Sequence, residues 1–249
     1  MFALEDVSVL DFALVGGIAF ATAVLGGVSG YGVGLILPIF VAPVVGVTGV
    51  IPVMAVAMFF TNFSRVWVYR AHLRLDAWAI VIATGTPSAV LGAWIYVQLP
   101  ARWIAAAIGG FLIVALILRR VLQRHRFAIG RPGLALVGVV YGTISGGMTG
   151  AGLILIAFLL AAGIEGAALI VTDAAVSVVF NLVKIVVFGT TATMTVPLFL
   201  AGCLIGLCTV PGTFVAGWIM ERVALRVHVL MIEAIVAFGG VWFLAQAVL

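Results

Sequence analysis

Two basic side chains stand inside apolar stretches of this sequence, where an uncompensated charge is costly. Arg65 and Lys184 each follow an asparagine by three residues, Asn62 and Asn181, which places each pair on nearly one face of a helix. A cation at membrane depth tends to be paired or functional, and an arginine fork or a lysine point charge can bind an oxyanion. These residues therefore predict an anion site. The structural alternatives are an Arg65 side chain that reaches the interface and asparagines that bridge helices.

Two acidic side chains, Asp173 and Glu233, also lie within apolar stretches. Asp173 shares a helical face with Ser177, Asn181 and Lys184, and such a polar stripe indicates a water-accessible path. A carboxyl group in a poorly solvated setting can hold a proton at physiological pH. Both acids are therefore candidates for proton coupling, with Asp173 first. A fixed ion pair, or a hydrogen bond to the backbone, is the alternative.

Glycine-rich breaks interrupt two long apolar segments. The first break runs from Gly26 to Pro38 and the second from Gly142 to Leu155, and both contain Ser-Gly followed by Gly-x-Gly-Leu-Ile-Leu. Broken backbone at membrane depth requires burial in protein or an adjoining watery cavity, and paired breaks in two halves point to a transporter's binding site. We expect the helix after each break to offer its N-terminal amides to an anion; close helix packing is the alternative. The predicted substrate-binding residues are Ser29, Gly30, Gly32, Gly34, Asn62, Arg65, Ser145, Gly146, Gly150, Gly152, Asn181 and Lys184.

The composition is that of a protein embedded in a lipid bilayer. Hydrophobic residues make up 65% of the chain and charged residues 8%, whereas soluble domains are about 25% charged. The net charge of +4 comes from arginines between apolar runs, as membrane orientation requires, so nucleic acid is not an expected partner. Cys203 and Cys208 lie in one apolar run without disulfide or zinc spacing. We expect no metal, no cofactor and no catalytic residue.

Elements that recur in order predict an internal duplication. Asn62, Arg65 and Tyr69 correspond to Asn181, Lys184 and Phe188, and both Pro87 with Trp94-Ile95 and Pro211 with Trp218-Ile219 keep one spacing. The predicted organisation is a first transmembrane repeat at 1–118, a cytoplasmic basic hinge at 119–132 and a second repeat at 133–249. Full spans are expected at 49–70, 76–99, 101–120, 166–189, 195–220 and 226–248.

Two topologies fit the segments that hold the breaks, about 12–45 and 134–162. Each segment is either one tilted crossing, or a V-shaped hairpin that enters to mid-membrane and returns to its own side. Basic residues favour the cytoplasmic side, and the hairpins place every arginine outside the spans there except Arg102. The predicted fold is therefore an all-α polytopic membrane protein. It has two inverted repeats, each a glycine-broken V-shaped hairpin plus three transmembrane helices, with both termini outside.

The breaks resemble a known family, the TauE/SafE transporters, described as sulfite exporters and sulfonate permeases (the toluene sulfonate uptake permease family). The resemblance rests on Ser29-Gly30 with Gly32-Val33-Gly34-Leu35-Ile36-Leu37-Pro38, on the basic turn Tyr69–Asp76, and on the spaced glycines from Gly142 to Gly152. The first glycine run is two residues shorter than the second, and Ile156 stands where the repeat would place a second proline. The resemblance implies a secondary transporter of small, often sulfur-containing anions.

The expected function is secondary transport of a small anion, with export of sulfite, an organosulfonate or a similar sulfur-containing anion. The anion is expected at the mid-membrane glycine breaks. A negative-inside potential favours anion exit by about 2.3 kcal/mol per charge per 100 mV. The alternatives are a membrane-embedded sulfur-relay enzyme subunit that uses Cys203 and Cys208, and a passive anion channel. The expected partners are the anion, a proton, the lipid of a cell inner or plasma membrane and, in a homodimer, a second copy of the chain.

Overall fold

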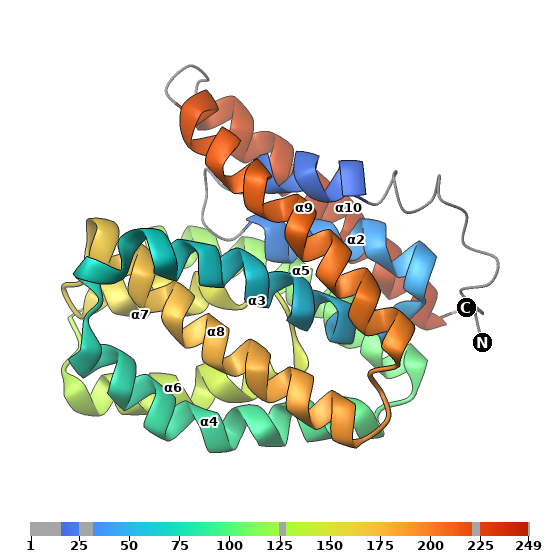
Figure 1. Ribbon diagram of the computed structural model, residues 1–249, viewed down its shortest axis with the longest axis horizontal. Coiled ribbons are helices and arrows are strands. Elements are labelled where there is room, and N and C mark those ends of the chain that lie inside the picture. Colours follow the sequence, from blue (N-terminus) through green and yellow to red (C-terminus); the bar gives the residue numbers. More distant parts are fainter. Residues whose placement is uncertain (1–15, 25–31, 125–127, 221–224, 249) are drawn as a thin grey trace.

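The computed structural model describes residues 16–24, 32–124, 128–220 and 225–248, and this part of the chain is helical without strands (Figure 1). After the helical segment 16–24, the elements are α2 (Gly32–Val45), α3 (Val47–Tyr69), the 3-10 turn η2 (Arg70–His72), α4 (Leu75–Gln98), α5 (Ala101–Arg124), α6 (Arg131–Gly147), α7 (Gly152–Ala161), α8 (Gly166–Thr190), α9 (Val196–Met220) and α10 (Leu225–Val248). The predicted spans agree with α3, α4, α5, α8, α9 and α10 to within a few residues at each end.

Several of the helices have the length and composition of membrane spans. Among the described residues, four segments are long and apolar enough to cross a bilayer: Val47–His72, Leu75–Gln98, Ala101–Leu118 and Gly166–Thr190. Helices α9 and α10 have 25 and 24 residues, against the about 20 that a crossing needs. The prediction of an all-α polytopic membrane protein is confirmed.

The second glycine break folds as a V-shaped hairpin. Helix α6 ends at Gly147 and α7 begins at Gly152, and between them Gly150 adopts a φ of 77°, a conformation that glycine reaches without strain. The backbone N–H of Ile129, just before α6, donates to the carbonyl of Ala161 at the end of α7 at 3.0 Å. Both arms therefore meet at one end of the bundle, and a straight crossing of α6 and α7 is excluded.

The first break has its returning arm where it was expected, in α2. The bend predicted for this break falls on residues 25–31, which lie outside the described residues together with Ser29 and Gly30. Helix α2 runs to the end of the bundle where Tyr96 donates a hydrogen bond to the carbonyl of Thr48 at 2.9 Å. Helix α7 runs to the opposite end, where α8 begins (Figure 1). The returning arms thus leave in opposite directions, as inverted halves require; the inverted relation of the whole halves and the boundaries at 118 and 133 stay predictions.

The two ends of the bundle differ in charge. The turns that carry Arg70, Arg74 and Arg131 gather at one end, and the turn before Arg102 lies at the other (Figure 1). Both of the topologies considered above predict this separation for these four residues, so it does not choose between them.

Small residues hold α6 tightly against α4. A methyl group on Gly142 would meet the carbonyl of Gly85, and one on Gly146 would meet the carbonyl of Ala89. Such backbone-to-backbone approach is typical of packed membrane helices. It fixes the position of α6 and hence of the break at its end.

Candidate functional site

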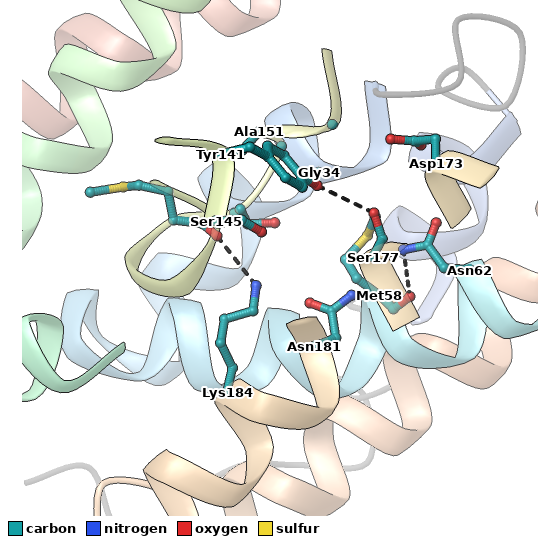
Figure 2. A pocket seen from close by; sticks show the side chains of 14 residues that line it. Gly34, Met58, Asn62, Tyr141, Ser145, Ala151, Asp173, Ser177, Asn181 and Lys184 are labelled. Carbon is teal, nitrogen blue, oxygen red and sulfur yellow. Dashed lines mark hydrogen bonds between the residues drawn. The ribbon is translucent and has the colours of Figure 1, made fainter. Parts of the chain in front are cut away.

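A cavity of about 40 Å³ lies where the α6–α7 break faces α8 (Figure 2). This is room for about three water molecules. The residues that line it come from α2, α3, α6, the break, α7 and α8: Gly34, Met58, Asn62, Tyr141, Ser145, Met148, Thr149, Gly150, Ala151, Gly152, Asp173, Ser177, Asn181 and Lys184. Two glycine breaks and the α8 stripe, far apart in sequence, therefore meet at one site.

The polar stripe of α8 forms one wall of the cavity. Asp173, Ser177, Asn181 and Lys184 follow one another along it, with Ser177 and Asn181 between the two charged groups (Figure 2). At 1.5 Å per residue, Asp173 and Lys184 are separated by about 16 Å along the helix axis. The spacing that predicted a shared face in the sequence thus produces a shared lining.

Lys184 is buried beside the end of α6. Its side chain is 2% exposed, and Nζ donates to the carbonyl of Met148, the residue that caps α6, at 3.3 Å. An ammonium has three donors, and a cation near a helix C-terminus is favoured by the helix dipole. Among the described residues that line the cavity, Lys184 is the only cation.

Asp173 is buried beside the start of α7. Its side chain is 5% exposed, and a methyl group built on Gly152, the first residue of α7, would lie 3.5 Å and 3.7 Å from the two carboxylate oxygens. Oδ1 has no hydrogen-bond partner within the described part of the chain. Arg65 on α3 lies within Coulombic range of this carboxylate.

The glycines of the two breaks differ in what surrounds them. A methyl on Gly34 would come within 2.8 Å of both Cα and N of Gly150, so α2 approaches the second break backbone to backbone. Gly152 has room for a methyl, facing Asp173. Gly34 therefore serves a close approach, while Gly152 leaves the first turn of α7 open to the cavity.

Both asparagines and Ser145, which were predicted to bind substrate, also line the cavity. The side-chain amide of Asn62 donates to the carbonyl of Met58 one turn earlier at 2.9 Å. One of its donors is therefore used within α3.

Other predicted site residues lie elsewhere. Gly146 packs on α4, and the half-buried Arg65 and Glu233 are not among the residues that line the cavity. Gly32 begins α2, one turn or less from Gly34. Cys203 and Cys208 are free, half-buried thiols on α9, also away from the lining.

Tyr141 is a lining residue that the sequence did not single out. Its hydroxyl lies 3.4 Å from Oγ of Ser177 (Figure 2), which joins α6 to the α8 stripe. The sequence could have indicated Tyr141, because it lies four residues before Ser145 and hence on the same face of α6. Thr149 and the two methionines, Met58 and Met148, carried no signal of their own, because their place depends on the fold of the break.

The comparisons with known proteins give one match. The family profile described as "Sulfite exporter TauE/SafE" matches residues 15–243, which is nearly the whole chain. Comparison with curated proteins and with solved structures gives no match.

Proposed function

Because this chain belongs to the sulfite exporter TauE/SafE family, a family of membrane transporters, we propose that it is a secondary transporter that exports sulfite or a compact organosulfonate. The anion binds in the cavity between the α6–α7 break and α8. The membrane of residence is the cell inner or plasma membrane, where the potential favours anion exit.

The observation that carries the proposal is the buried Lys184 ammonium beside the break. A buried cation requires a counter-charge or strong hydrogen bonds, and one backbone carbonyl supplies only part of this. An anion in the cavity would use the remaining donors. The small volume favours anions of a few heavy atoms over aromatic sulfonates.

The start of α7 supports the same ligand class. The first N–H groups of a helix have no partner within the helix and carry partial positive charge. Gly152 leaves this turn uncovered by a side chain. Lys184 and the α7 amides thus offer positive charge from two sides of the break, while Ser145 and Asn181 add neutral polar groups.

The test is anion binding to the protein purified in detergent, measured as thermal stabilisation by sulfite, thiosulfate, methanesulfonate, an aromatic sulfonate and acetate. Sulfite or methanesulfonate should stabilise the wild type, and the aromatic sulfonate should not. Lys184→Gln keeps a donor for the Met148 carbonyl but removes the charge. We expect its anion affinity to fall by about tenfold to a hundredfold, the value of a charged hydrogen bond.

Arg131→Gln is the matched control, because Arg131 is an exposed cation at the start of α6 and its loss should leave the affinity unchanged. Equal affinity of Lys184→Gln and wild type would contradict the proposed site. In proteoliposomes held at zero voltage, an imposed proton gradient should drive the anion against its own concentration gradient only when the anion and the proton move together. An anion flux that never runs uphill under a proton gradient would indicate the passive channel instead.

A further inference from the structure

The carboxyl group of Asp173 occupies the approach to the same helix end that the anion would use. Both of its oxygens face the first residue of α7 across a gap that would just hold a methyl group at ordinary contact distance. The side chain lines the cavity, is 95% buried, and leaves Oδ1 without a hydrogen bond in the described part of the chain. An anion that enters this small cavity would therefore be repelled by the ionised carboxylate of Asp173.

Few other charged groups face Asp173. Arg65 approaches from α3 and the hydroxyl of Tyr141 from α6, while Lys184 lies three turns further along α8. Helices α2 and α7 and the break carry no ionisable side chain. The positive end of α7 and Arg65 therefore act on one carboxylate, and an anion entering the cavity competes with it for the start of α7.

We propose that Asp173 is the proton site of the transporter, and that an anion occupies the start of α7 only when Asp173 is protonated. This proposal rests on the proposed function, because it assumes that the anion binds in the same cavity. It adds a proton that binds there together with the anion. The proton adds to a carboxylate oxygen from the water that enters the cavity, and it leaves by the same route. No other bond forms or breaks.

The reason is electrostatic linkage. Two like charges repel strongly where water is scarce, so anion binding and proton binding at Asp173 favour each other by the same factor. Protonation also leaves the amides at the start of α7 open to the anion. A divalent anion that moves with one proton still carries one net negative charge, so the membrane potential still favours its exit.

The experiment measures methanesulfonate affinity of the purified protein as a function of pH. A sulfonate stays fully charged across roughly pH 5 to 9, so any pH dependence belongs to the protein. The wild type should lose affinity by about tenfold per pH unit once Asp173 loses its proton. Asp173→Asn is neutral at every pH, so it should bind at all pH values with the affinity that the wild type has at low pH.

Asp76→Asn is the matched control. Asp76 lies at the start of α4, half-exposed and paired with Arg74 at 3.2 Å, and its replacement should leave the pH dependence intact. A direct measurement does not need any variant. At a pH where the wild-type affinity has begun to fall, adding methanesulfonate to weakly buffered wild-type protein should take up protons, approaching one proton per anion bound, and the pH of the solution should rise.

Each possible result of these measurements either supports or contradicts the proton site. Three results would overturn the proton site and leave the anion site in place: anion affinity of the wild type that does not depend on pH, an Asp173→Asn variant with the wild-type pH dependence, or binding without proton uptake at a pH above the fall in affinity. Failure of every anion in the panel to bind at any pH would overturn the proposed function and the proton site together.

Discussion

The two charged residues of α8 lie beside the two helix ends at the second glycine break, and each has the charge that stabilises the helix end beside it. Lys184 lies at the end of α6, where carbonyls carry partial negative charge, and Asp173 lies at the start of α7, where amides carry partial positive charge. Each charge stabilises its helix end. Under the proposed function, an anion would have to displace or neutralise one of these interactions, and that cost would weaken its binding.

Gly152 tests whether the start of α7 is the binding surface. Gly152→Ala adds a methyl at ordinary contact distance from Asp173, so we expect wild-type thermal stability without ligand. The methyl covers the first turn of α7, and we expect anion affinity to fall by about tenfold or more through loss of a charged hydrogen bond. The measurement is anion-induced thermal stabilisation. Wild-type affinity in this variant would place the anion away from α7.

Several of the residues at the site could be predicted from their spacing in the sequence. Asp173, Asn181 and Lys184 were predicted because polar residues at helical intervals share a face, and the structure puts them along one cavity. Gly146 was grouped with the binding glycines because it belongs to the same run. Its role depends on Ala89, which only the packing of α6 on α4 brings beside it.

Whole elements were predictable where length and apolarity decide them. A bilayer sets the length of a crossing helix, so the six long helices α3, α4, α5, α8, α9 and α10 could be located from the apolar runs of the sequence. The bend of α6–α7 was inferred from arginine positions, and the hydrogen bond between Ile129 and Ala161 confirms it. The approach of Gly34 to Gly150 had no signal in the sequence, because it depends on how α2 packs against the second break.

The contact between α2 and the break predicts a stability difference. Gly34→Ala would push a methyl into the backbone of Gly150, and neither main chain can move without shifting its helix. We expect a loss of about 1–3 kcal/mol, as for overpacked cores, seen as a lower thermal midpoint. Gly110→Ala on α5 is the control, since nothing lies within 4 Å of its added methyl. Equal midpoints for the two variants would show that α2 and the break are loosely packed.

For the molecule as a whole, the hairpin topology and the positions of the basic residues together predict which turns face the cytoplasm. We expect the turn at 128–131 to be cytoplasmic and the turn at 191–195 to face the opposite side. Cysteines introduced at Ala192 and Gly130, after Cys203 and Cys208 are replaced by alanine, should be labelled by a membrane-impermeant reagent from opposite sides of the membrane. The cysteine-free background should also retain transport, because neither thiol lines the cavity. Labelling of Ala192→Cys from the cytoplasm alone would contradict the topology.

The brevity of α7 has a consequence for biogenesis. With 10 residues, it spans about 15 Å, half of a bilayer core of about 30 Å, and the break before it carries backbone groups that lipid cannot satisfy. The hairpin therefore cannot partition into lipid as a unit when it leaves the ribosome. We expect the hairpin to insert only after α8 has emerged from the ribosome and supplies Lys184 and Asp173. At least one further helix must then be translated before α6 and α7 can enter the membrane.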